Sequence, residues 1–294
     1  MNFDTNSYFA KYQDATILIT GNARSGTTIL GKVIGSMQDV EYFFEPPVVW
    51  GLFNVIDTLD PETWKYLYNV SVYEELFYGA ILGRNLNFNV NDDSYILNMK
   101  TQEEIASRLS VSLRKSEIEK IAEKSKIAFK MPDLIPFLGR YISYFPKATV
   151  VVIRRNPTDT INSLLVKNWL QVASLNESNV MWPLVKYKEQ RIPAWVKKTD
   201  YEFWLGLDDI NRCAYYYMIM DEDLQHNNIY KLKYDELVKD SKAEIEKLAI
   251  RLGLEFTDRT LELIDEIKFP EKDRISNIES LICSEIGNRI FKNA

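Results

Sequence analysis

A strand, a glycine-bounded loop and a helix follow one another without a gap near the start of the sequence. Thr16 to Thr20 (TILIT) is a β-branched run typical of a buried strand in a parallel sheet. The loop Gly21 to Thr28 (GNARSGTT) comes next, and apolar residues then recur at helical spacing from Thr27 to Met37. Backbone N–H groups in such a loop point toward one place, where the helix dipole adds positive potential. The unit predicts an α/β fold with an oxyanion site at the end of its first strand.

Four further runs predict strands that continue the sheet. They cover residues 41–44, 126–130, 148–153 and 229–233, and the helical pattern of Leu134 to Tyr144 joins two of them into a βαβ unit. Helical patterns also cover residues 62–82, 102–123 and 201–225.

These patterns predict the organisation of the whole chain. With 294 residues, of which 46% are hydrophobic, the chain can bury a large core. We expect a single domain over residues 1–294, with helical insertions at about 50–125 and 168–226. The expected fold is a P-loop NTPase-like α/β fold with a doubly wound parallel sheet.

The charge and the cysteines exclude several classes of protein. A formal net charge of -6 argues against sequence-independent binding of nucleic acid, which needs a basic field. Cys213 and Cys283 are far apart and lack metal-ligand spacing, so we expect two reduced thiols and no metal site. No apolar stretch approaches the roughly 18 residues of a membrane-spanning helix, and no secretory signal is visible. We therefore expect a soluble protein, cytoplasmic by default.

The loop differs from a triphosphate-binding loop in one decisive position. The spacing from Gly21 to Gly26 matches the start of the Walker motif, but Thr27 stands where that motif requires lysine. The basic residue is Arg24 instead. A Mg-dependent phosphoryl transferase also needs a carboxylate at a nearby strand end, whereas two arginines follow the strand at 148–153. These arginines favour a phosphate ligand over a metal ion.

A second pattern indicates a second anion site. Arg155 ends a strand, and Ser163 lies two turns into the helix that follows, so both side chains can face one anion. Lys167 lies four residues after Ser163 and is either a third phosphate contact or an exposed lysine near the helix end. Two anion sites imply a ligand with separated phosphates.

Taken together, these motifs resemble those of one enzyme family. Ala23 to Thr28 resembles the 5′-phosphosulfate loop of sulfotransferases, and Arg155 with Ser163 is similar to their 3′-phosphate motif. Residues 229–240 resemble the late strand and tyrosine-acidic-acidic-leucine turn of the family. The matches lie in the family's order within residues 16–253 and leave the helical regions between them unmatched.

The resemblance implies a donor and the residues that bind it. The donor is 3′-phosphoadenosine 5′-phosphosulfate (PAPS), which leaves adenosine 3′,5′-bisphosphate (PAP) after transfer, with no metal. Arg24 is implied at the bridging region and Thr27 and Thr28 at the 5′-phosphate, with Ser25 and Gly26 completing the loop.

Four basic or aromatic residues have weaker support from the sequence. Lys130 ends a strand and Tyr234 follows one, so either side chain can reach the donor or only support the sheet edge. Lys272 and Arg274 lie in a loop that in relatives often closes over the nucleotide.

The general base expected from the resemblance is a glutamate. Cytosolic small-molecule sulfotransferases use a histidine from the middle of the chain, whereas the one histidine here, His226, is expected on the surface. Glu45, in the sequence Tyr42 to Pro47 (YFFEPP), follows the second strand and resembles the glutamate of tyrosylprotein and carbohydrate sulfotransferases. The alternative for Glu45 is a capping role at a strand end.

The acceptor is the least constrained part of the prediction. Trp50 lies five residues beyond Glu45 and resembles an aromatic residue of carbohydrate-modifying relatives, so a glycan hydroxyl is the first hypothesis and a peptide tyrosine the second. From other classes, a P-loop nucleotide kinase and a noncatalytic nucleotide-binding protein remain as hypotheses.

Overall fold

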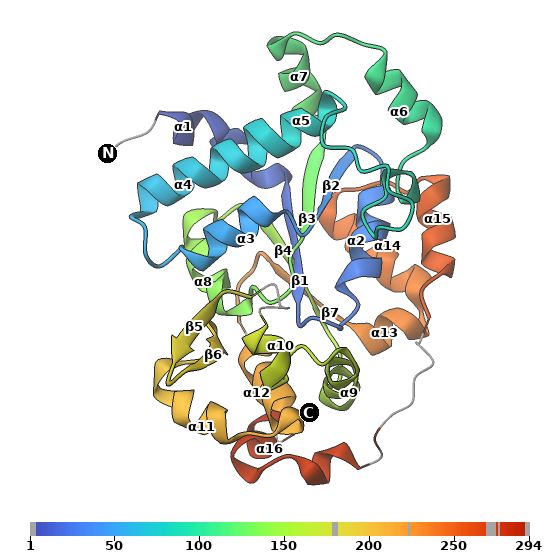
Figure 1. Ribbon diagram of the computed structural model, residues 1–294. Helices are drawn as coiled ribbons and strands as arrows, with labels where there is room; N and C mark the ends of the chain where they lie inside the picture. Colours follow the sequence, from blue (N-terminus) through green and yellow to red (C-terminus); the bar gives the residue numbers. More distant parts are fainter. Residues whose placement is uncertain (1–3, 178–181, 223, 269–274, 276, 292–294) are drawn as a thin grey trace.

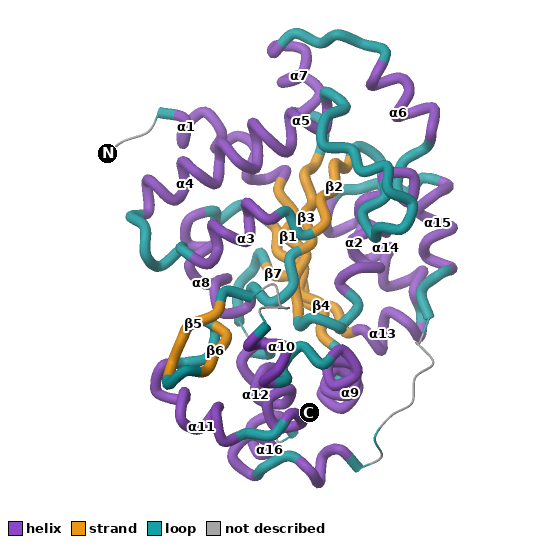
Figure 2. The backbone as a smooth tube through the Cα atoms, viewed as in Figure 1, coloured by secondary structure: helices purple, strands orange, loops and turns teal. Residues whose placement is uncertain are grey.

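The computed structural model describes residues 4–177, 182–222, 224–268, 275 and 277–291 (Figures 1 and 2). A parallel sheet of five strands lies at the centre, in the order β2-β3-β1-β4-β7. The strands are β1 (Thr16–Gly21), β2 (Val40–Phe44), β3 (Lys126–Lys130), β4 (Thr149–Arg154) and β7 (Ile229–Lys233). Each lies within a residue of its predicted position, which confirms the parallel sheet.

Alternate residues of each strand face two separate helical layers. In β1, Ile17 and Ile19 pack with helices on one side, and Leu18 packs with helices on the other. The first layer, at the right of Figure 1, consists of α2 (Thr27–Ser36), α13 (Tyr234–Lys239), α14 (Ser241–Leu252) and α15 (Asp258–Asp265). The second contains α3 (Pro47–Asn54), α4 (Pro61–Asn69), α8 (Ile135–Tyr144), α9 (Pro157–Lys167), α12 (Asp209–Met220) and α16 (Ser284–Ile290). The P-loop NTPase-like, doubly wound fold is thereby confirmed.

The first predicted insertion is helical, but its helices are divided differently. Residues 62–82 form α4, a π-helical stretch at Val70–Phe77 and α5 (Tyr78–Ile81). The helix predicted over 102–123 is wrong, since the structure has α6 (Gln102–Leu109) and α7 (Lys115–Ala122). Two caps explain the break. The Thr101 hydroxyl accepts the Glu104 N–H at 3.1 Å, and the Glu117 carboxylate accepts the Arg114 N–H at 2.8 Å, so each helix has its own start.

The second insertion contains a hairpin that the sequence did not predict. It consists of β5 (Leu184–Tyr187) and β6 (Gln190–Pro193), which pair antiparallel. Its turn residues, Lys188 and Glu189, both have positive φ, at 46° and 62°. Such turns usually carry Asn-Gly or Asp-Gly, so this one leaves no signal in the sequence. The helix predicted over 201–225 is likewise divided, into α11 (Tyr201–Gly206) and α12, because Asp208 caps a new helix.

The remaining elements are short. They are α1 (Thr5–Phe9), α10 (Val172–Asn176) and 3₁₀ turns at Ala10–Ala15, Ile96–Asn98, Lys198–Asp200 and Ile278–Leu281. Within the described part of the chain, no helix combines the length and apolar character needed to cross a bilayer.

Candidate active site

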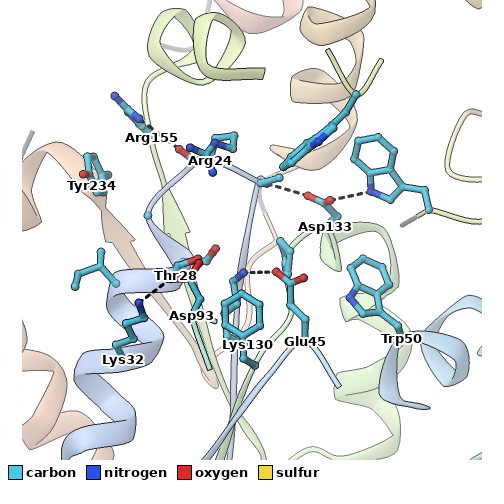
Figure 3. Close-up of a pocket in the computed structure, with 18 residues that line it drawn as sticks. Arg24, Thr28, Lys32, Glu45, Trp50, Asp93, Lys130, Asp133, Arg155 and Tyr234 are labelled. Atoms are coloured by element: carbon cyan, nitrogen blue, oxygen red, sulfur yellow. Dashed lines mark hydrogen bonds and ion pairs between the residues drawn. The ribbon is translucent and has the colours of Figure 1, made fainter. Parts of the chain in front are cut away.

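A cavity of about 560 Å³ opens at the carboxyl ends of the central strands. Ligands of open α/β sheets bind at this edge. The cavity is lined by the loop after β1, the ends of β2 to β4, and three tryptophans (Figure 3). Of the residues predicted from the sequence, those that line it are Arg24, Gly26, Thr27, Thr28, Glu45, Lys130, Arg155 and Tyr234.

Three predicted residues do not line the cavity. The Ser25 hydroxyl is buried and donates to the Asn22 carbonyl at 2.6 Å, inside the turn. Ser163 is buried behind Arg24, and Lys167 is exposed in the last turn of α9. Lys272 and Arg274 lie outside the described residues.

The loop requires glycine at Gly26 for two reasons. Its φ is 98°, in a region that L residues rarely occupy, and the ring of Tyr234 would lie 2.4 Å from an added Cβ. Tyr234 therefore packs beneath the loop and supports it. Thr27 and Thr28 begin α2 and line the cavity, so the end of the helix at which backbone N–H groups lack intrahelical partners borders the cavity.

Arg24 and Arg155 lie next to each other above the cavity (Figure 3). The Arg24 Nε donates to the Ser163 hydroxyl at 3.1 Å, and an Arg155 amino group donates to the Arg24 carbonyl at 3.4 Å. Burial and then the Arg155 charge lower the pKa of Arg24. Among the described residues Arg24 has no ion-pair partner, so the two adjacent guanidinium groups form a positive region that an anion would stabilise.

The Arg155 side chain contacts Asp159, the Tyr234 ring and the Arg24 carbonyl. It forms an ion pair with Asp159 at 3.1 Å, and its guanidinium lies 5.0 Å from the centre of the Tyr234 ring. Its Nε is buried and, among the described residues, has no hydrogen-bond partner. The prediction that both strand-end arginines serve the ligand is corrected for Arg154, which donates to the Glu222 carbonyl at 2.8 Å and does not line the cavity. Adjacent residues of a strand point to opposite faces, so only one of the two can enter the site.

Glu45 and Lys130 form an ion pair on the opposite side of the cavity (Figure 3). Glu45 directly follows β2, Lys130 ends the neighbouring strand β3, and the Glu45 N–H donates to the Lys130 carbonyl at 2.9 Å. The Lys130 ammonium is nearly buried and lies 4.3 Å from the centre of the Phe44 ring, whereas a fifth of the Glu45 side chain is exposed. The carboxylate is therefore accessible from the cavity, and the lysine is held against it.

Three residues that line the cavity have a left-handed backbone conformation. Arg24, Glu45 and Asp133 have φ of 72°, 44° and 65°, although none is glycine. Each such conformation costs about 1–3 kcal/mol and persists where the surrounding structure imposes it. The strained backbone thus directs three charged side chains toward one space.

The sequence did not predict a second ion pair that lines the cavity. Lys32, one turn beyond Thr28 on α2, binds the Asp93 carboxylate at 2.7 Å. Lys32 follows Thr28 by four residues and therefore lies on the same helix face, so the sequence could have indicated that Lys32 lies near the site. Asp93 comes from the loop after α5, and only the fold brings it here.

Asp133 is a third cavity residue that the sequence did not predict. It follows β3 and is fully buried beneath the loop, where it accepts the Ala23 N–H at 2.9 Å and the Trp182 indole N–H at 2.9 Å. The Tyr216 hydroxyl also donates to it. Burial raises the pKa of Asp133 to about 6, an effect that outweighs these three hydrogen bonds and is increased by the nearby Glu45 charge.

The raised pKa predicts how stability depends on pH. Between the ordinary carboxyl value of 3.8 and about 6, the folded state binds more protons than the unfolded state. Stability from this residue is therefore greatest below pH 4 and falls by about 3 kcal/mol as the pH rises through 6. The free energy of unfolding, measured for wild type and Asp133→Asn across pH 4 to 7, should show this loss in wild type only. Parallel pH curves would contradict the prediction.

Three tryptophans form the wall near Glu45. Trp50, at the start of the first insertion, and Trp169 and Trp182, in the second, all line the cavity. Trp169 and Trp182 meet edge to face, with ring centres 6.3 Å apart. Trp50 lies beside Glu45 in Figure 3. His226 is exposed, does not line the cavity and accepts the Asn228 N–H through Nδ1 at 3.2 Å.

The arrangement of loop, arginines and sheet edge agrees with a comparison of the sequence with protein families. A model of the sulfotransferase family matches residues 16–258, well over half of the chain. This chain belongs to the sulfotransferase family. It is an enzyme that transfers a sulfuryl group to an acceptor. A comparison with curated protein sequences gave no match.

Several solved sulfotransferases have a similar structure at low sequence identity. The sulfotransferase domain of the curacin biosynthetic pathway is 14% identical, with 90% of this chain and 80% of that domain covered, at a TM-score of 0.48. The sulfotransferase domain of a Synechococcus olefin synthase is 13% identical, with 89% and 79% covered, at a TM-score of 0.44. A mouse sulfotransferase complexed with PAP is 12% identical, with 99% and 86% covered, at a TM-score of 0.41.

Proposed function

We propose that this sulfotransferase carries the sulfuryl group of PAPS to a hydroxyl of a carbohydrate or glycoconjugate, with Glu45 as the general base. One observation carries the proposal: a cationic loop and an accessible carboxylate lie across a single cavity from each other, with Lys130 bound to the carboxylate. Sulfuryl transfer needs this combination of positioning and charge, because the departing bisphosphate is strongly anionic.

The residues around the loop fit the donor. The buried Arg155 Nε lacks a partner among the described residues, and the adjacent Arg24 charge is uncompensated, so both favour an anionic ligand. In the proposal Arg24, Thr27 and Thr28 hold the 5′-phosphosulfate, and Gly26 and Ser25 shape the loop. Arg155 holds the 3′-phosphate, Ser163 orients Arg24, Tyr234 supports the nucleotide side, and Lys167 remains outside the cavity.

The chemical step follows from the positions of the charges. The acceptor oxygen attacks sulfur, a new S–O bond forms, and the bond from sulfur to the bridging phosphate oxygen breaks. The acceptor proton passes to a Glu45 carboxylate oxygen, and PAP leaves with the bonding electron pair. Lys130 and Arg24 stabilise the charge that develops on the bridging and sulfuryl oxygens.

The tryptophan wall favours a sugar as acceptor. Ligand pockets commonly combine aromatic walls with a few polar groups, and three indole rings that line the same cavity as Glu45 give an aromatic wall of this kind. The Trp50 indole N–H is buried and lacks a hydrogen-bond partner within the described part of the chain, so it is available to an acceptor oxygen. A peptide tyrosine in acidic surroundings fits less well, because Glu45 and Asp93 line the same space.

A ligand-binding experiment with two arms tests the donor and the acceptor. At a PAP concentration of 100 Kd, without metal, we expect a Tm increase of about 5 to 10 °C, whereas ATP with Mg²⁺ has little effect. In the second arm, transfer of labelled sulfate from PAPS is compared between oligosaccharides and tyrosine peptides, and we expect it to the oligosaccharides.

Each arm has an outcome that would overturn its part of the proposal. Stabilisation by ATP with Mg²⁺ but not by PAP would exclude the PAPS donor. Transfer to tyrosine peptides alone would replace the glycan acceptor and leave the donor assignment intact.

A further inference from the structure

Asp133 connects three parts of the chain that are distant in sequence. Its Oδ1 accepts the Ala23 N–H of the loop at 2.9 Å, and the Tyr216 hydroxyl of α12 donates to the same oxygen. Its Oδ2 accepts the indole N–H of Trp182, in the tryptophan wall, at 2.9 Å. Figure 3 shows Asp133 between the loop and this wall. One buried carboxylate thus joins the donor side of the cavity to the acceptor side.

Asp133 is itself fixed from below. Its backbone N–H donates to the Gly21 carbonyl at 2.9 Å, and its φ of 65° is a left-handed conformation that the surrounding contacts must impose. The Ala23 N–H is shared, since it also points to the Tyr216 oxygen at 2.7 Å. The loop therefore has a rigid attachment two residues after β1 and one residue before Arg24.

The hydrogen bonds decide between a chemical and a positioning role for Asp133. Both carboxylate oxygens already accept hydrogen bonds from the protein, and the side chain is 3% exposed. Glu45 is more exposed and has the ammonium group of Lys130 as its ion-pair partner. A proton acceptor must reach the substrate, which favours Glu45 as the base and Asp133 as a support.

We infer that Asp133 is a positioning residue that holds the phosphosulfate loop and Trp182 in one arrangement, so that the acceptor wall and the donor loop are coupled through it. Of the two measurements below, only PAP affinity depends on the proposed donor, whereas hydrogen exchange in the ligand-free protein does not. Loss of the Trp182 hydrogen bond is expected to loosen the loop even though Trp182 belongs to a different segment. Removing a donor to a buried carboxylate changes an equilibrium by about tenfold or more.

The test compares two identical substitutions in the same aromatic cluster. Trp182→Phe removes the N–H donor to Asp133 and keeps an aromatic ring. Trp195→Phe is the matched control, because the Trp195 ring packs 5.7 Å from that of Trp182 and 5.4 Å from that of Tyr216. Its buried N–H has no hydrogen-bond partner among the residues that the structure describes.

Two measurements are made on each full-length variant. In the ligand-free protein, amide hydrogen exchange at residues 21–28 is expected to become about tenfold faster in Trp182→Phe and to stay unchanged in Trp195→Phe, with β4 unaffected in both. PAP affinity is expected to fall about tenfold in Trp182→Phe only. Tyr216→Phe should speed exchange at residues 21–28 and weaken PAP binding as Trp182→Phe does. When Asp133 is already replaced by Asn, adding either substitution should have a smaller effect than it has in the wild-type protein, because all three act through the same carboxylate.

The results separate this inference from the proposed donor. If Trp182→Phe leaves exchange at residues 21–28 at the wild-type rate, the coupling is refuted, whatever PAP does. Equal acceleration by Trp182→Phe and Trp195→Phe also refutes it, because general loosening of the aromatic cluster would then be the cause. If the wild-type protein binds no PAP, the donor assignment fails and the exchange comparison still decides the coupling.

Discussion

Replacing Glu45 with glutamine is expected to lower kcat for sulfuryl transfer by about 10²- to 10⁴-fold, the range that a positioned general base contributes. Donor affinity should be retained or increase, because the nearly buried Lys130 loses its ion-pair partner and an anionic donor then compensates its charge. Single-turnover kinetics with saturating donor measure the chemical step, and PAP titration measures the affinity.

The matched control for Glu45→Gln is Asp93→Asn, which removes one negative charge from the same cavity. Asp93 pairs with Lys32, whereas Glu45 pairs with Lys130, so we expect a change in kcat of at most a few-fold. The large drop in the single-turnover rate should therefore occur in Glu45→Gln and not in Asp93→Asn. A Glu45→Gln enzyme with wild-type single-turnover rates would show that another group removes the proton.

The second large effect is expected at Arg155. The change Arg155→Met should weaken PAP binding by about 100-fold or more, because the proposed charge-assisted contact to the 3′-phosphate is lost. It also removes the ion-pair partner of the buried Asp159 carboxylate, which costs stability. The double variant Arg155→Met/Asp159→Asn removes that negative charge as well, and isothermal titration of this variant separates the loss of binding from the loss of stability.

Arg154 provides the control, since it is the last residue of β4 and directly precedes Arg155. Its side chain donates to the Glu222 and Asp221 carbonyls, at 2.8 and 3.3 Å, outside the cavity. Arg154→Met should therefore change PAP affinity by about twofold at most, the size of a screened surface charge effect. Equal losses from Arg154→Met and Arg155→Met would indicate a diffuse electrostatic field, not a phosphate site.

The strands and the loop could be predicted because their causes are local. The β-branched run before Gly21 specifies a buried strand by its composition, and Gly26 is required by the backbone of one turn. The hairpin turn at Lys188 and Glu189 could not be predicted, because neither residue is the Asn, Asp or Gly that usually adopts positive φ in such turns. Helix breaks at Asp208 and Arg114 depend on side-chain caps that periodicity does not register.

The residues of the candidate site also differ in whether local sequence or distant contacts determine their positions. Residues within one motif, such as Arg24 and Thr28, share the cavity because a loop and its helix carry them together. Ser163 was expected to contact the ligand, but its hydroxyl accepts a hydrogen bond from Arg24. Residue spacing along the helix does not distinguish between these two roles. Asp133 acquires its role only from Ala23 and Tyr216, 110 and 83 residues away, and no local pattern marks such a residue.

The cavity is built from two kinds of segment, the ends of the sheet strands and the two insertions, and this division matters for engineering. The sheet supplies the loop, Lys130 and Arg155, whereas Trp50 and Trp182 arrive on the two insertions. Under the proposed function, exchanging an insertion for that of another sulfotransferase should change acceptor preference and leave the donor-binding residues of the sheet in place. A replacement for the second insertion must again present an N–H group to Asp133 and a hydroxyl in the position of Tyr216, because both hold the loop after β1.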